Sequence, residues 1–152
     1  MLQIDITGSN STTGELKLEV NGRPNNGHSE ANKTDRVHWK VKPSSGVDHI
    51  SAITMKNIAG SRDVFSGNPP APQSADKKDW KGIVDGNAPD YSVYVYKIDW
   101  VPDGSSTPKI FDPIISIKPT EVNIAKLFPV LVGVLALLSI SLLLSDKKKK
   151  HK

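Results

Sequence analysis

The side chains best suited to chemistry in this sequence are its histidines. His28, His38 and His49 fall in the N-terminal third, and His151 lies in a run of lysines near the C-terminus. Neutral imidazole binds Zn²⁺, Cu²⁺ and Fe²⁺, so converging histidines would form a metal or redox site. The sequence contains no cysteine, which excludes thiolate zinc sites, iron–sulfur clusters and disulfides. A metal site would need His49 with His38 or His28; the alternative is three surface or half-buried histidines.

Motifs for enzymatic chemistry are missing from the sequence. It contains neither a nucleophile elbow of the G-x-S-x-G type nor a glycine-rich phosphate loop. Many of its aspartates fall in or beside predicted turns, where an Asp side chain commonly stabilises the turn. The spacing of a Ca²⁺-binding loop is also missing. These observations predict a protein that is not an enzyme and that has no cofactor.

The segment Asp35-Arg-Val-His-Trp39 is followed after a turn by His49-Ile50. This arrangement resembles the D-x-V-x-W/F strand and the first ligand histidine of cupredoxin-like domains. Over residues 35–118 the resemblance implies a β-sandwich with His49 as a copper ligand. The loop at 98–108 departs from the family, because it has no Cys, His or Met, whereas a blue-copper site needs two His and one Cys. The resemblance therefore implies the fold, and a degenerate metal-binding or redox protein is the alternative function.

Alternation of apolar and polar residues indicates β-strands along most of the chain. The segments with this pattern or with strand-forming composition are 2–6, 15–20, 35–41, 49–56, 80–84, 91–101 and 109–118. Turn residues separate these segments, and residues 25–33 are expected to form an exposed loop. No amphipathic helix of useful length is visible. The pattern predicts an all-β domain, an antiparallel β-sandwich of cupredoxin-like or immunoglobulin-like type.

The strand predicted at 91–101 carries most of the aromatic residues. Its alternation places Tyr94, Tyr96, Ile98 and Trp100 on one face, which we expect in the core. A ligand-binding aromatic face is the alternative, favoured if Tyr91 is exposed.

Two proline-containing segments are candidate contact surfaces for a partner. Pro113 interrupts the last predicted strand and indicates a bulge or an edge position. Residues 68–72, of sequence NPPAP, predict a rigid extended loop.

The segment from Leu127 to Leu144 contains no charged residue. As a helix it would be roughly 27 Å long at about 1.5 Å per residue, close to the roughly 30 Å hydrocarbon core of a bilayer. We therefore predict a β-domain at 1–118, a linker at 119–126, a transmembrane helix at 127–145 and a basic tail at 146–152. A buried core helix is the alternative, but a β-domain of this size has no room for one.

The positive charge of the chain belongs to its tail. Residues 1–125 contain 14 Lys and Arg against 15 Asp and Glu, whereas residues 126–152 contain 6 Lys and one Asp. A domain without excess positive charge argues against nucleic-acid binding. The tail lysines could bind anionic lipid headgroups. They are Lys147, Lys148, Lys149, Lys150 and Lys152.

The sequence predicts a single-pass membrane protein. Two observations give opposite predictions for its orientation in the membrane. Lysines next to a membrane span prefer the cytoplasm, which would place the β-domain outside. No signal peptide is visible at the N-terminus, however, and exporting the domain would need one. The balance slightly favours a tail-anchored protein with a cytoplasmic β-domain.

The expected function is that of a membrane-tethered, non-enzymatic module. Its expected partners are the lipid bilayer and an unknown protein, which it binds or scaffolds at the membrane. Tethering raises the effective concentration of a weak binder near its partners.

Overall fold

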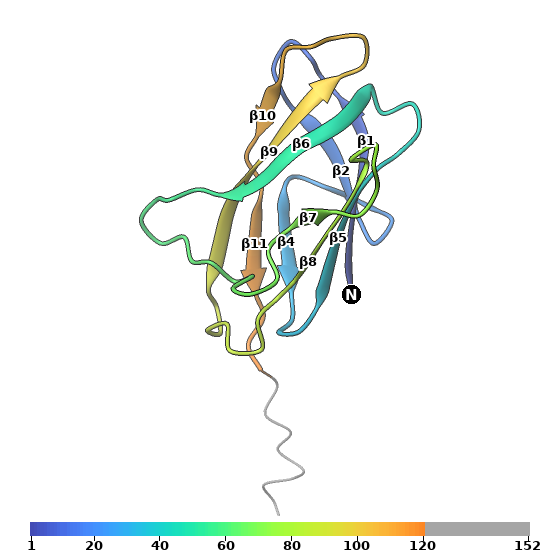
Figure 1. Cartoon of the computed structure of the whole chain (residues 1–152). Coiled ribbons are helices and arrows are strands. Elements are labelled where there is room, and N and C mark those ends of the chain that lie inside the picture. The colour runs from blue at the N-terminus through green and yellow to red at the C-terminus, as the bar shows by residue number, and fades with distance from the viewer. Residues whose placement is uncertain (121–152) are drawn as a thin grey trace, which may run out of the picture. The chain divides into compact units, whose positions relative to one another are not determined.

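The computed structural model describes residues 1–120, which form β-strands and turns and no helix (Figure 1). The strands are β1 (Leu2–Ser9), β2 (Leu16–Val20), β3 (Arg23–Asn25), β4 (His28–Ala31), β5 (Arg36–Val41), β6 (Val47–Met55), β7 (Ala71–Pro72), β8 (Asp79–Ile83), β9 (Val93–Pro102), β10 (Lys109–Phe111) and β11 (Ile114–Ile117). Residues Met1–Thr120 make one compact unit. Over this part of the chain, no helix is long and apolar enough to cross a membrane. The predicted transmembrane helix and basic tail lie outside the described residues.

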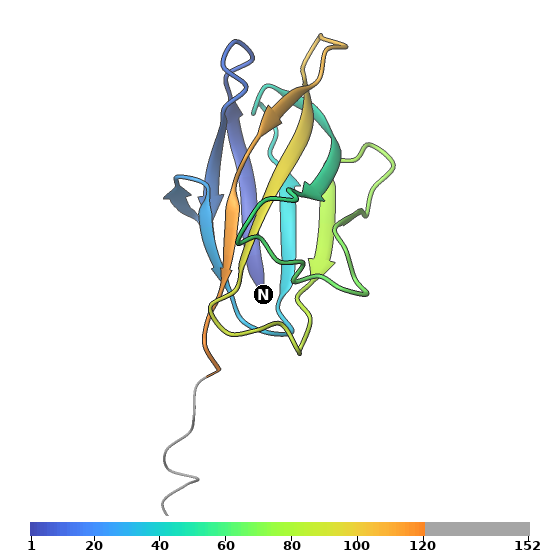
Figure 2. The same ribbon diagram turned by 90° about the vertical axis from the view of Figure 1, so that its left-hand side faces the viewer.

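The strands form two sheets that face each other as layers (Figures 1 and 2). The first sheet has six strands in the order β3-β2-β1-β5-β8-β7. The second has the order β10-β9-β11-β4, and β6 also pairs with β9. Strands β10 and β11 each pair with a different part of the long strand β9, antiparallel in both cases.

The prediction of an all-β domain is confirmed, but the prediction of antiparallel sheets is only partly right. Strand β1 pairs in parallel with β5, and β11 pairs in parallel with β4. Strand β4 belongs to the second sheet, so the chain crosses between sheets before β5 returns beside β1 in the same direction. Residues 25–33, predicted as a loop, contain this strand.

Side chains alternate between the core and the solvent along the strands, as the period of two requires. On β5, Val37, Trp39 and Val41 are buried, and on β9 Tyr94, Tyr96, Ile98 and Trp100 are buried. The expected core face of residues 91–101 is thus confirmed. Val64 and Phe65 are also fully buried, although they belong to no strand.

Pro113 does not lie at a free edge. It is buried between β10 and β11, where the predicted strand 109–118 is interrupted, and its carbonyl accepts a hydrogen bond from the Tyr96 N–H at 3.2 Å. Strand β11 lies between β9 and β4. The predicted contact surface near Pro113 is therefore wrong for β11, although β10 does end its sheet.

Candidate functional site

His49, the histidine that the cupredoxin resemblance singles out, lies on β6 opposite Val101 of β9. Its Nδ1 lies 2.7 Å from Oδ2 of Asp48, and the imidazole is 32% exposed. A shallow hollow of about 350 Å³ beside it is lined by Asp76 and two lysines of the same turn. Cations close to an open carboxylate–imidazole pair disfavour a metal ion there.

The other two candidate histidines each have a different polar partner. His38 projects from the outer face of β5, and its Nε2 lies 2.5 Å from Oδ1 of Asp79 on β8. His28 lies on β4, and its Nε2 lies 2.8 Å from Oγ of Ser116 on β11. Both contacts join neighbouring strands, so both have an ordinary structural explanation.

The structure does not bring the three histidines together. His38 belongs to the six-stranded sheet, whereas β9 and β11 lie between His49 and His28 in the second sheet. Within residues 1–120, no group of three or more His, Cys, Asp or Glu side chains could hold a metal ion. A site joining the His49–Asp48 pair to another histidine would be such a group. The described residues therefore offer no assembled ligand set for the metal-binding alternative.

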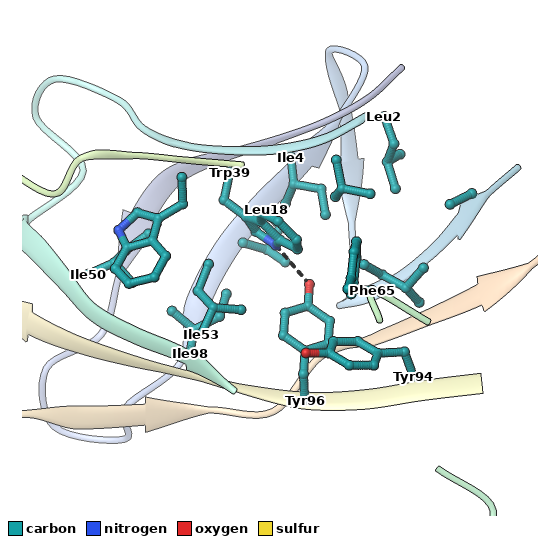
Figure 3. Packing of buried hydrophobic residues seen from close by; sticks show 14 of the residues in the cluster. Leu2, Ile4, Leu18, Trp39, Ile50, Ile53, Phe65, Tyr94, Tyr96 and Ile98 are labelled. Atoms are coloured by element: carbon teal, nitrogen blue, oxygen red, sulfur yellow. Dashed lines mark hydrogen bonds between the residues drawn. The ribbon is translucent and has the colours of Figure 1, made fainter. Parts of the chain in front are cut away.

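The aromatic side chains form a core rather than a ligand-binding face (Figure 3). Trp39 donates its indole N–H to the hydroxyl of Tyr96 at 3.0 Å, which connects the two sheets. Phe65 packs edge-on against Tyr94 at 5.0 Å between ring centroids. Burial raises the pKa of the Tyr96 hydroxyl far above its usual value, so this group stays protonated. Tyr91 differs from these residues because it is exposed.

The NPPAP segment, Asn68–Pro72, covers the edge of the six-stranded sheet. Strand β7 within it pairs with β8, and the Ile83 N–H donates to the Asn68 carbonyl at 3.1 Å. Further along, the Gln73 N–H donates to the Asp79 carbonyl at 2.7 Å. Prolines on an outer strand leave few free donors, which protects the sheet from pairing with another chain. The segment thus contains the short strand β7 instead of being a loop throughout, and it is extended where it pairs with β8.

A groove of about 430 Å³ lies between this segment and the outer face of β5 and β8. Its lining includes Arg36, Lys81 and Ile83 from the sheet, and Asn68, Ala71 and Gln73 from the other side. Gly82 also lines it, and a Cβ there would lie 3.0 Å from the buried Phe65 ring and 3.3 Å from the Pro70 nitrogen. Glycine therefore allows the segment to approach β8 this closely.

Two cations without carboxylate partners face this groove. Arg36 and Lys81 are exposed on adjacent strands, and neither belongs to an ion pair formed among residues 1–120. On the same strands, His38 lies opposite Lys81, and the carboxylate of Asp79 is engaged by His38. Guanidinium and ammonium groups beside two side-chain amides form a set of hydrogen-bond donors suited to carboxylates.

The sequence identified only half of this candidate site. The proline-rich segment is visible in it, but Arg36 and Lys81 look like ordinary charges on the solvent face of two strands. Only the pairing of β5 with β8, which sets Arg36 opposite Ile83 and His38 opposite Lys81, brings the two cations together.

Comparison with known proteins gives no relative from which to transfer a function. No protein-family model matches the chain, and no curated protein matches it significantly. The physical features of the chain therefore have to carry any functional assignment.

Proposed function

We propose that this protein is a membrane-tethered, non-enzymatic β-sandwich module that binds a protein partner at a bilayer. The uncharged segment Leu127–Leu144 supports the tether, and two facing sheets support the sandwich. Strand β5, which carries Val37 and Trp39 of the cupredoxin-like pattern, lies inside its sheet. The mixed pairing of β1 with β5 and β2 argues against an immunoglobulin-like arrangement, because immunoglobulin-like sandwiches are antiparallel.

The groove beside the NPPAP segment is the proposed contact surface. The observation that carries this proposal is the pair of cations, Arg36 and Lys81, that face it without carboxylate partners among the described residues. Ile83 is 37% exposed beside them and adds apolar surface. A partner segment that presents carboxylates next to an apolar side chain would complement this lining.

Reversing both charges, Arg36→Glu with Lys81→Glu, is expected to weaken partner binding at least about tenfold, since like charges then face each other across the contact. A photo-crosslinking amino acid at Ala71, on the groove, would report the contact in native membranes. The wild-type chain should give discrete crosslinked proteins, and their yield should fall with increasing salt because the cations are solvent-exposed.

The matched control is Lys17→Glu with Lys109→Glu, which reverses two lysines outside the groove and changes the net charge equally. This control should keep the wild-type crosslinks. Equal crosslinking by the groove variant and the control would show that the groove is not the contact surface.

We further propose that the β-domain faces the cytoplasm, the orientation that the sequence slightly favours. The chain has no Cys, so single thiols at Ser106→Cys and His151→Cys report each side cleanly. A membrane-impermeant maleimide on intact cells is expected to label only the tail thiol. Labelling of the Ser106→Cys thiol alone would reverse the orientation.

A further inference from the structure

The loop of residues 85–91 is hydrogen-bonded to the residues that follow β11. The Tyr91 N–H donates to the Ile117 carbonyl at 3.0 Å, and the Thr120 hydroxyl donates to Oδ1 of Asp90 at 3.2 Å. In Figures 1 and 2 this loop lies at the end of the domain toward which the chain runs after β11. The loop is thus fastened to the last residues before the segment 121–126.

Tyr91 is held facing the solvent at this end. Its side chain is 74% exposed, while Tyr94 and Tyr96 a few residues later are buried. Its φ of 61° places it in the left-handed region, which costs a non-glycine residue of order 1 kcal/mol. The loop therefore keeps a large aromatic side chain outside the core in a backbone conformation that is unfavourable for it.

Lys33, Arg62 and Lys118 lie on segments bonded to this loop or to the strand that follows it, and Lys33 and Lys118 are in ion pairs. Lys33 pairs with Asp90 at 2.7 Å, and this hydrogen bond holds the pKa of the Asp90 carboxyl below its usual value. Arg62 is exposed, and its backbone N–H donates to the carbonyl of Val93, two residues after Tyr91. Lys118 pairs with Glu30 at 3.4 Å. Tyrosine, lysine and arginine are residues typical of a membrane–water interface, and here Asp90 and Glu30 balance two of the three cations.

The length of the chain limits how far this end can lie from the apolar segment. Six residues, 121–126, separate Thr120 from Leu127. A fully extended chain spans at most about 3.6 Å per residue, so the distance from Thr120 to Leu127 cannot exceed roughly 25 Å. If Leu127 begins a membrane span, Thr120 lies no more than roughly 25 Å from it, which permits the 85–91 loop to reach the headgroup layer.

We propose that the 85–91 loop contacts the bilayer surface, with the Tyr91 ring in the headgroup layer and Lys33, Arg62 and Lys118 near lipid phosphates. This contact rests on the proposed tether and adds to it a fixed orientation of the domain. It directs the opposite end, where β10 lies in both views, away from the membrane (Figures 1 and 2).

The test uses the full chain carrying Tyr91→Trp, reconstituted in vesicles of phosphatidylcholine and phosphatidylglycerol with a spin label near the lipid headgroups. The native Trp39, Trp80 and Trp100 are at most 6% exposed, so they contribute a background that lipid does not reach. The control is Ile110→Trp, whose position on β10 is 56% exposed. We expect quenching of the Tyr91→Trp signal by roughly twofold, and no extra quenching for Ile110→Trp, because only interfacial side chains meet the label.

Alkaline carbonate extraction of the same vesicles separates this inference from the proposed tether. A chain that resists extraction while its Trp at position 91 is unquenched refutes the contact and leaves the tether intact. A chain that carbonate extracts is not inserted, and that outcome overturns both. Equal quenching at positions 91 and 110 also refutes a fixed orientation.

Discussion

Trp39→Ala is expected to lower the free energy of unfolding by about 3 to 5 kcal/mol, the largest stability loss that we predict for a single substitution here. Trp39 is fully buried. Its ring centroid lies 6.0 Å from that of Phe65 and 5.9 Å from that of Tyr96 on the facing sheet. The truncation removes both of these contacts. A domain of this size is stable by about 5 to 15 kcal/mol, so the variant should lose a large part of its stability. Urea unfolding of residues 1–120, followed by circular dichroism, measures the loss.

Tyr96→Phe separates the hydrogen bond from the packing at this position. The ring remains, but the Trp39 indole N–H loses its acceptor at 3.0 Å, and a buried unpaired donor costs about 1 to 3 kcal/mol. If this hydrogen bond stabilises the fold, the double variant Trp39→Phe with Tyr96→Phe should lose less free energy of unfolding than the sum of the two single variants. Strict additivity would show that the hydrogen bond between the sheets contributes nothing to stability.

The core could be predicted from the sequence wherever a strand buries one face. The positions of Val37, Trp39 and Val41 follow from the period of two, as do those of Tyr94 and Tyr96 on β9. Val64 and Phe65 could not be found in this way, because the loop that carries them has no alternating pattern. They enter the core because Gly82 leaves room for the Phe65 ring.

The direction of strand pairing could not be predicted from the sequence, because apolar and polar residues alternate in the same way in parallel and antiparallel strands. The sequence therefore gave no sign that β1 pairs in parallel with β5. The groove depends on this kind of information, since Arg36 and Lys81 meet through the register of β5 and β8. The histidine prediction depended on it too: His38 meets Asp79 across two strands rather than meeting His49.

The charge-balanced domain and the basic tail assign different tasks to the two parts of the chain. Residues 1–125, with 14 Lys and Arg and 15 Asp and Glu, have little general attraction to an anionic membrane. The proposed association with a bilayer would then depend on the apolar segment, and the proposed Tyr91 contact would set the orientation. Under this proposal the groove cations are not needed at the membrane and stay available for a partner.

Leu135→Arg with Leu138→Arg is expected to move the protein from the membrane fraction to the soluble fraction. Each arginine near the middle of a span costs about 2.5 to 3.5 kcal/mol for insertion, and the segment's favourable terms are only a few tenths of a kcal/mol per apolar residue. The wild-type chain should stay in the pellet after carbonate treatment of cell membranes, and the variant should not.

The matched control for this charge change is Ser51→Arg with Thr54→Arg, which adds two arginines at exposed positions of β6. It should stay in the membrane pellet like the wild-type chain, because these positions lie in the β-domain and not in the apolar segment. Equal fractionation of all three proteins would contradict the anchor, since two arginines in the middle of a membrane span should prevent its insertion. A wild-type chain found entirely in the soluble fraction would contradict it as well, and would require another explanation for eighteen successive uncharged residues before a lysine-rich tail.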